Sequence, residues 1–344
     1  MRLINARAPV RICDLGGWTD TWFMPPTQGR VCNIAVAPFV EVQLAVDRRA
    51  AREAQVVLDV SDFGDRYRFE LGGEPGRHPL LEQTVAEMGV PDDVSLEITI
   101  HSEMPPGCGT GTSAAVTVAL VAALDGLTPL RMEPAEVART AHRIETERLG
   151  LESGVQDQLA AAHGGVSTIR MFEFPLAIAQ PVHLPEKVAW ELERRLMLVF
   201  LGAAHRSDDV HQKVIARLVE EQGASEELAA LARAAERGEE ALVGLDLEAF
   251  GRAMIDNNEA QAALHPELVS ERARQVIALA REHDASGWKV NGAGGAGGSL
   301  TVLSGPRASD RRRLGRVVDA LGEGVRVVPV TLSAHGVRCW DTPA

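Results

Sequence analysis

Every second residue from Val94 to Ile100 is apolar, and polar residues stand between them. A period of two predicts a half-buried β-strand. The segment 114–124 is apolar except for Thr117, and its length and alanine content favour a buried helix over a buried strand. The pattern therefore predicts a strand, a connecting loop and a helix in succession.

Further along the chain, helical and strand-like patterns follow one another in a mixed order. Three short apolar runs predict buried strands: 196–201, 299–303 and 325–332. Residues 309–321 have helical spacing, and the stretch 208–284 is nearly all helical in pattern. Residues 1 to about 180 alternate strand-like and helix-like segments. The predicted fold class is therefore α+β in both halves of the chain.

A further helix is predicted over residues 135–149, because Pro134 suits a first helical turn and Gly150 a helix end. Glu145 lies on a stripe of this helix that is otherwise apolar. A carboxylate in such a place is costly unless a cation or a hydrogen-bond donor meets it, and a magnesium ion would serve. The alternative is an ion pair with Arg148, three positions on at the helix surface.

Length and charge narrow the class of protein. A chain of 344 residues exceeds what one hydrophobic core usually serves, so two closely joined domains are expected. The excess of Asp+Glu (48) over Lys+Arg (35) gives a net charge of -13, which argues against nucleic acid as the main partner. No apolar run approaches the ~20 residues that cross a bilayer, and no charged-then-apolar leader opens the chain. The four cysteines are scattered without a Cys-x-x-Cys pair, which predicts free thiols, no structural zinc and a cytoplasmic location.

The loop between the predicted strand and helix has the composition of an anion site. Its residues are Pro106, Gly107, Cys108, Gly109, Thr110, Gly111, Thr112 and Ser113. Three glycines let the backbone approach a ligand, and the free N–H groups that open the next helix attract negative charge. The loop lacks the Gly-Lys-Ser/Thr ending of a P-loop, and it fits a loose dinucleotide pattern that needs a second strand where more helix is predicted. Taken alone, it is equally consistent with a small-residue turn into a core helix.

Two further segments join this loop in a pattern that resembles the GHMP kinases, the family of galactokinase, homoserine kinase and mevalonate kinase. Residues 8–20 are similar to the family's first motif, with Arg11 and Asp20 at the matching separation, and residues 289–298 resemble its third. The motifs stand in the family's order and spacing, so the resemblance covers nearly the whole chain. It implies a two-domain GHMP kinase fold with a ribosomal protein S5 domain 2-like N-terminal domain (1–190), which holds the ATP and catalytic residues, and a ferredoxin-like C-terminal domain (191–344).

The resemblance also implies roles for single residues. Asp157 matches the aspartate that faces the substrate hydroxyl, and Arg11 matches the arginine beside it, so both are expected to be catalytic. Ser113 and Glu145 match the family's Mg²⁺ ligands, and the loop 106–113 its site for the ATP phosphates. Three glycines of the third motif are expected to support the closed ATP site: Gly292, Gly294 and Gly295.

Each of these assignments has a plain structural alternative. Asp157 is also typical of an ordinary helix start, and Ser113 of a helix N-cap. The glycine run of the third motif is most simply a tight turn, and Ala296 stands there where glycine is more usual in the family.

The first motif also implies what the substrate is. The expected substrate contacts are Gly17, Trp18, Thr19, Asp20 and Arg206. The motif is closer to the fucokinase and D-glycero-D-manno-heptose 7-phosphate kinase branch than to galactokinases, which have Glu-His in place of Gly17-Trp18. Asp20 would accept hydrogen bonds from sugar hydroxyls, although a turn aspartate is the alternative. A sugar that already carries a phosphate needs a basic contact, for which Arg30 and Arg206 are the candidates.

The implied activity is transfer of the γ-phosphoryl group of ATP to the anomeric hydroxyl of a heptose 7-phosphate or a fucose-like sugar. Three other functions stay open at this point. A non-catalytic sensor would keep the nucleotide fold without transfer, a nicotinamide-dependent dehydrogenase would use the loose dinucleotide pattern, and a related kinase would act on a mevalonate-type or amino alcohol. The joint presence of Arg11, Ser113, Glu145 and Asp157 weighs against the sensor.

Overall fold

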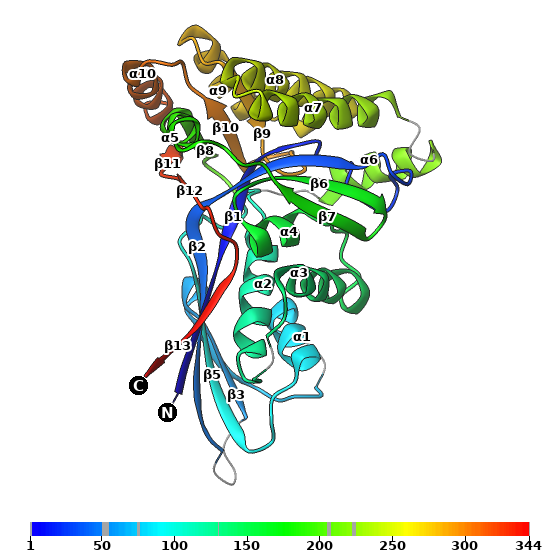
Figure 1. Cartoon of the computed structure of the whole chain (residues 1–344), viewed down its shortest axis with the longest axis vertical. Helices are drawn as coiled ribbons and strands as arrows, with labels where there is room; N and C mark the ends of the chain where they lie inside the picture. Colours follow the sequence, from blue (N-terminus) through cyan, green and yellow to red (C-terminus); the bar gives the residue numbers. More distant parts are fainter. Residues whose placement is uncertain are drawn as a thin grey trace.

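The computed structural model describes residues 2–49, 55–73, 76–129, 131–204, 208–221 and 225–343. Within these ranges the chain forms two β-sheets, of nine and four strands, and helices pack against both (Figure 1). Mostly antiparallel sheets together with segregated helices confirm the predicted α+β class.

The larger sheet is built mainly from the first half of the chain. It contains β1 (Arg2–Leu15), β2 (Arg30–Arg48), β3 (Val56–Val60), β4 (Asp65–Phe69), β5 (Val94–Ser102), β6 (Val166–Glu173), β7 (Leu176–Pro181), β12 (Thr331–Leu332) and β13 (Arg338–Pro343). Its main order is β13-β1-β2-β5-β3-β4, while β6 and β12 also pair with β2, and β7 pairs with β6. Among the described strands of this sheet only β3 and β5 run parallel to each other.

Four helices cover one face of this sheet (Figure 1). They are α1 (Pro79–Met88), α2 (Thr112–Asp125), α3 (Pro134–Arg143) and α4 (Gln156–His163). Nearly all of α2 is buried, because it packs against β1, β2 and the three other helices. β5, the loop and α2 lie where the alternation of residues predicted them. Along the described chain α3 follows α2, so the loose dinucleotide pattern does not open a βαβ unit.

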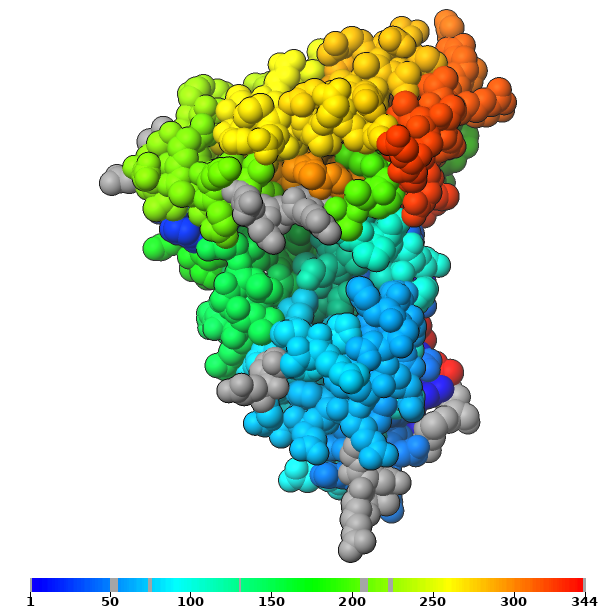
Figure 2. All heavy atoms as spheres, turned by 180° about the vertical axis from the view of Figure 1, so that it is seen from behind, coloured from blue at the N-terminus to red at the C-terminus, as the bar shows by residue number. Residues whose placement is uncertain are grey.

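The smaller sheet and most remaining helices come from the second half of the chain. The strands are β8 (Leu196–Leu201), β9 (Gly287–Val290), β10 (Ser299–Leu303) and β11 (Val325–Val328), in the antiparallel order β11-β8-β10-β9. The helices are α5 (Glu186–Arg195), α6 (Asp208–Glu220), α7 (Glu226–Val243), α8 (Leu247–Leu264), α9 (Glu271–Glu282) and α10 (Ala308–Asp319). Figure 2 shows from the opposite side that the yellow and orange helices α8–α10 lie above the cyan and blue segments of the first half. The predicted strands 196–201 and 299–303 and the predicted helical stretch 208–284 are confirmed.

The prediction of one strand over 325–332 is wrong. Pro329 has no backbone N–H and separates β11, which pairs with β8, from β12, which pairs with β2 in the other sheet. The chain then ends in β13 beside β1, so both termini lie together in Figure 1. The two last strands thus join the larger sheet although they follow residue 190, and the division 1–190 and 191–344 remains a prediction.

The helix predicted over 135–149 changes its winding part-way. α3 ends at Arg143, and a π-helical turn continues it over Ile144–Arg148. Such turns occur often at functional sites, and this one contains Glu145. None of the described helices combines the length and apolar character that crossing a membrane requires.

Candidate active site

The loop 106–113 lies between β5 and α2, and glycines shape it. Gly107, Gly109 and Gly111 have positive φ angles of 66°, 71° and 69°, which side chains rarely adopt. A Cβ on Gly109 would lie 3.1 Å from the backbone oxygen of Asn291, and one on Gly111 would lie 3.0 Å from the Asp157 carboxylate. Close approach and conformation therefore both require glycine at Gly109 and Gly111.

The other loop side chains divide into buried and accessible ones. Cys108 and Thr110 are buried, so their side chains are not accessible to a ligand. Ser113 is exposed on the first turn of α2. The N-cap of α2 is Gly111, so the alternative that Ser113 is only an N-cap is wrong.

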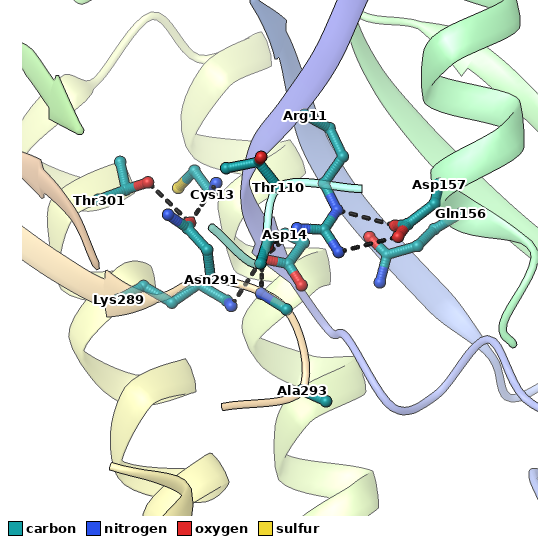
Figure 3. A network of polar contacts seen from close by, with 12 residues as sticks. Arg11, Cys13, Asp14, Thr110, Gln156, Asp157, Lys289, Asn291, Ala293 and Thr301 are labelled. Atoms are coloured by element: carbon teal, nitrogen blue, oxygen red, sulfur yellow. Dashed lines mark hydrogen bonds and ion pairs between the residues drawn. The ribbon is translucent and has the colours of Figure 1, made fainter. Parts of the chain in front are cut away.

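Arg11 and Asp157 meet beside this loop, as the sequence predicted (Figure 3). Asp157 lies in the first turn of α4, and its Oδ1 and Oδ2 accept hydrogen bonds from Arg11 Nε at 2.8 Å and Nη2 at 3.1 Å. Arg11 is buried on β1, and its Nη1 also donates to the backbone oxygen of Gly109. Burial alone would lower the pKa of Arg11, but the charges of Asp14 and Asp157 outweigh burial and raise it. This paired contact holds the Asp157 carboxylate in one orientation.

Glu145 faces α2 from the π-helical turn and is 5 % exposed. Its Oε2 accepts a hydrogen bond from Gln158 Nε2 at 3.0 Å, and its Oε1 lies 3.4 Å from Thr117 Oγ1. Burial, with a contribution from the charge of Asp157, raises the pKa of Glu145 to about 7. The alternative ion pair with Arg148 is wrong, because Arg148 Nε instead donates to Glu87 at 2.9 Å.

Thr117 connects the two expected magnesium ligands. Its hydroxyl lies within hydrogen-bonding distance of both the Ser113 backbone oxygen (3.1 Å) and Glu145 Oε1 (3.4 Å). Thr117 therefore joins the start of α2 to the π-helical turn that carries Glu145.

The first motif lines a pocket of about 280 Å³ together with Arg11 and Asp157. Gly17, Trp18 and Asp20 are among its lining residues, as expected. Thr19 does not face this pocket: it is buried, and its hydroxyl contacts the backbone oxygens of Gly16 and Arg30 at 2.7 and 2.8 Å. The Thr19 side chain therefore holds the turn in shape, and the substrate contact expected of Thr19 stays a prediction.

Asp20 lies at the buried end of this pocket. Its Oδ2 accepts a hydrogen bond from the backbone N–H of Gln156 at 3.0 Å. Burial raises the pKa of Asp20 to about 6, although the hydrogen bond from Gln156 opposes this shift, and the charge of Asp157 adds to it. A Cβ on Gly154 would lie 2.1 Å from Asp20 Oδ2, so the segment before α4 packs directly on this carboxylate.

The third motif packs on the phosphate loop through Gly292. Gly292 has a φ of 65°, and a Cβ there would lie 2.9 Å from the backbone oxygen of Gly109. Gly294 and Gly295 contact Leu268 instead: the Gly295 N–H donates to the Leu268 oxygen at 2.9 Å, and a Cβ on Gly294 would lie 2.3 Å from the same oxygen. Gly292 therefore packs on the phosphate loop, while Gly294 and Gly295 hold the third motif against Leu268.

Two arginines were expected as possible contacts for a substrate phosphate, and the structure describes one of them. Arg30 Nη1 forms an ion pair with Glu236 Oε1 at 2.7 Å. Arg206 lies outside the described residues.

A second pocket opens on the other side of the phosphate loop, with a volume of about 610 Å³. Four loop residues line it: Pro106, Gly107, Thr112 and Ser113. Phe63, Arg77 and His78 form part of its opposite wall, and the rings of Phe63 and His78 lie 5.7 Å apart. This wall is held by the buried Glu82, which accepts backbone hydrogen bonds from Arg77 at 3.1 Å and His78 at 3.2 Å.

Several polar residues of the site were not predicted from the sequence. Asp14 and Lys289 form a buried ion pair at 2.8 Å, although 275 positions separate them. Gln156 and Gln158 flank Asp157 and contact Asp20 and Glu145. The two glutamines adjoin a predicted catalytic residue in the sequence, and this position could have marked them as site residues. Nothing in the local sequence indicates that Asp14 pairs with Lys289.

A family model described as GHMP kinases N terminal domain matches residues 80–165. These residues contain the phosphate loop, Glu145 and Asp157. The chain carries a GHMP kinase N-terminal domain. The match begins in α1 and ends after α4, so the family signature coincides with the helices that position the site.

Comparison with known proteins extends this likeness along nearly the whole chain. The D-glycero-alpha-D-manno-heptose 7-phosphate kinase of Campylobacter jejuni is 23% identical over 347 residues, which cover 99% of each chain. The bifunctional fucokinase/GDP-fucose pyrophosphorylase of Arabidopsis thaliana is 26% identical over 320 residues, which cover 88% of this chain and 30% of that protein. The crystal structure of a D-glycero-D-manno-heptose 1-phosphate kinase from Bacteriodes thetaiotaomicron has a TM-score of 0.77 at 21% identity and covers 99% of this chain and 100% of that chain. The predicted resemblance and the GHMP kinase fold are confirmed.

Proposed function

We propose that this protein is an ATP-dependent sugar kinase that transfers the γ-phosphoryl group to a sugar hydroxyl. The favoured acceptor is the anomeric hydroxyl of a heptose 7-phosphate or a fucose-like sugar, in line with the names of the relatives. One observation carries the proposal: the paired contact between Arg11 and Asp157 lies beside the phosphate loop and lines the pocket that also contains Asp20.

The larger pocket is the proposed nucleotide site. Loop N–H groups and the first turn of α2 supply donors and a positive helix end for the phosphates. The aromatic wall with Phe63 and His78 suits a flat base. ATP is the nucleotide that kinases of this family use, and the phosphates would reach the smaller pocket past Gly109 and Gly111.

Ser113 and Glu145 are the proposed ligands of Mg²⁺. The fit rests on Glu145, a buried carboxylate with a raised pKa that pairs with no cation in the described part of the chain. A hydroxyl and a carboxylate are the hard oxygen donors that Mg²⁺ selects. Bound Mg²⁺ would neutralise charge on the transferred phosphoryl group. Gln158 and Thr117 orient the Glu145 carboxylate from two directions.

Asp157 is proposed to orient or deprotonate the acceptor hydroxyl. Its carboxylate lines the smaller pocket and is partly exposed, so a hydroxyl can reach it. Arg11 holds that carboxylate in place and stabilises charge that develops between the nucleophile and the phosphoryl group. Positioning and charge neutralisation supply most of the barrier reduction in phosphoryl transfer, and these two side chains provide both.

The smaller pocket suits a molecule with many hydroxyl groups. Asp20 and Asp157 offer carboxylate oxygens, and Trp18 offers an apolar face. Gln156 Oε1 is a buried acceptor that makes no hydrogen bond with any described residue. Hydroxyl donors of a sugar would complement such a set of acceptors.

The experiment is a panel of acceptors incubated with ATP and Mg²⁺, with the phosphorylated position determined by NMR. The panel contains heptose 7-phosphate, fucose, other free sugars, mevalonate and an amino alcohol. The proposal predicts the highest kcat/KM for a heptose 7-phosphate or a fucose-like sugar. Preference for mevalonate or the amino alcohol would assign the non-sugar alternative, and ATP binding without transfer to any acceptor would assign a sensor.

A further inference from the structure

Asp14 is a buried carboxylate at the centre of the polar network in Figure 3. It lies on β1 three residues after Arg11, and its Oδ1 accepts hydrogen bonds from Lys289 Nζ at 2.8 Å and from the Gly292 N–H at 3.1 Å. Lys289 is equally buried on β9, and its Nζ also donates to the Val290 oxygen at 2.5 Å. Burying one of these charges without the other would cost several kcal/mol. The ion pair therefore has to form as a unit.

The ion pair continues into the catalytic pair. Asp14 Oδ1 lies 3.9 Å from Arg11 Nη1, while Arg11 contacts Asp157 at 2.8 and 3.1 Å. Four charges thus alternate in sign in the order Lys289, Asp14, Arg11 and Asp157. Arg11 lies closer to Asp157 than to Asp14, so Arg11 remains paired with Asp157. Lys289 neutralises Asp14.

We propose that Lys289 is a positioning residue for phosphoryl transfer, because it neutralises Asp14 and so leaves Arg11 paired with Asp157. This inference rests on the proposed function. Without the Lys289 charge, Arg11 would be the one cation that the described residues place beside Asp14. Coulomb attraction grows as the separation shrinks, so Arg11 would shift toward Asp14 and loosen its contact with Asp157.

The same pair also anchors the third motif, which offers a competing explanation. Asp14 Oδ1 holds the Gly292 N–H, and Gly292 packs on the phosphate loop at Gly109. If anchoring were the whole role of the pair, loss of Lys289 would disturb the nucleotide pocket and raise KM for ATP. If the charge balance positions Arg11, loss of Lys289 lowers kcat and leaves substrate binding nearly unchanged.

The test compares Lys289→Gln, Asp14→Asn and the double variant, with the exposed Lys187→Gln as control. Folding is verified by circular dichroism, and kcat and both KM values are measured well below the melting temperature. A misplacement of about 1 Å can cost on the order of 10²-fold, so kcat of Lys289→Gln should fall about 10- to 100-fold with both KM values within about threefold. The double variant lacks both charges, so its kcat should return to within about tenfold of the wild-type value. The kcat of Asp14→Asn should also lie within about tenfold of the wild-type value.

Two results would overturn the inference. One is a folded Lys289→Gln variant with wild-type kcat and a raised KM for ATP, which assigns the pair to anchoring. The other is a double variant that stays as slow as Lys289→Gln. If Lys289→Gln does not fold, the other two variants decide, and loss of turnover in either one rejects the charge-balance role. Wild-type turnover in the same assay tests the proposed function separately, because a wild-type protein that phosphorylates no acceptor contradicts that function whatever the variants do.

Discussion

Four ionisable residues of the site occupy environments that differ sharply. Arg11 and Asp157 satisfy each other in a paired contact, whereas Asp20 and Glu145 are buried carboxylates that form no ion pair with a described cation. Buried carboxylates without a cation reduce the folding stability at neutral pH, so they are expected where a bound ligand or metal compensates for this loss. Both lie where the proposed function needs an acceptor or a metal.

The first prediction concerns Asp157. Asp157→Asn keeps the size of the side chain but removes the charge that orients or deprotonates the acceptor hydroxyl. We expect kcat to fall by at least about 10²-fold, while folding and the affinity for ATP stay near the wild-type values. Steady-state kinetics and a nucleotide titration measure these quantities. Near-normal turnover of a soluble variant would remove Asp157 from the catalytic role.

The second prediction concerns the pH dependence of stability at Asp20. Its pKa is about 6 in the folded protein against an ordinary value of 3.8, so the folded state binds this proton more tightly than the unfolded state. The stability that this carboxyl contributes is complete below the ordinary pKa and is lost as pH rises through about 6. Asn does not ionise, so Asp20→Asn should gain on the order of 2–3 kcal/mol relative to wild type between about pH 4 and pH 7.5. Urea unfolding at both pH values measures the difference, and exposed Asp92→Asn should show none of it.

The third prediction concerns the metal. Glu145→Gln removes the carboxylate charge but keeps an oxygen and the shape of the side chain, so the half-saturating Mg²⁺ concentration should rise on the order of tenfold at fixed ATP. Glu147 is exposed on the same π-helical turn, so Glu147→Gln is the matched control and should leave this concentration unchanged. An unchanged Mg²⁺ requirement in Glu145→Gln would exclude Glu145 as a ligand.

At the scale of single residues, the sequence predicted contacts that belong to recognisable motifs. Arg11 and Asp157 were predicted to stand together and do so. Asp14 and Lys289 were not paired in advance, because a contact between strands 275 positions apart leaves no periodic signal in one sequence. Thr19 was assigned to the substrate with its motif, but its side chain turns inward to hold backbone oxygens.

At the scale of elements, the site depends on loops that approach each other without side chains between them. The phosphate loop and the third motif meet at Gly109 and Gly292, where either Cβ would fall within 3.1 Å of a backbone oxygen of the other loop. β5 and α2 hold the first loop at its two ends, and β9 and β10 hold the second. Strands of both sheets therefore hold the phosphate loop and the third motif and fix the distance between them.

The fourth prediction tests this loop contact. Gly109 and Gly322 have similar φ angles of 71° and 68°, so alanine is strained by about 1–2 kcal/mol at either position. A Cβ meets the Asn291 oxygen at 3.1 Å from Gly109 but meets nothing within 4 Å from Gly322. Both variants should therefore lose stability, while only Gly109→Ala should raise KM for ATP, by about tenfold or more. Equal KM values in the two variants would contradict a functional contact between the loops.

The bounds of an element could be predicted where the local pattern of apolar residues determines them. They could not be predicted where the choice of the pairing strand determines them. The alternation in β5 and the apolar run of α2 predicted both elements, because β5 buries one face on a period of two and α2 is apolar and buried over nearly its whole length. The run 325–332 looked like one strand, yet Pro329 divides it between two sheets. The π-helical turn at Glu145 was also not predicted, because one inserted position leaves the apolar stripe nearly intact.

At the scale of the whole molecule, two sheets bring together segments that lie far apart in the sequence. β1 carries Arg11 and Asp14 from the larger sheet, β9 carries Lys289 from the smaller one, and α4 presents Asp157 from the helical layer (Figures 1 and 3). β13 pairs with β1, so the end of the chain completes the sheet in which the site begins. The order and class of these parts followed from the sequence, but their meeting point became visible only in three dimensions.

The account as a whole is tested most directly by following the γ-phosphoryl group of ATP by phosphorus NMR, with Mg²⁺ and each sugar of the panel. We predict that a sugar phosphate ester appears as fast as ADP and that neither forms at that rate without the sugar. ADP release that is independent of the acceptor, or an ATP-bound protein that phosphorylates no alcohol, would contradict a sugar kinase.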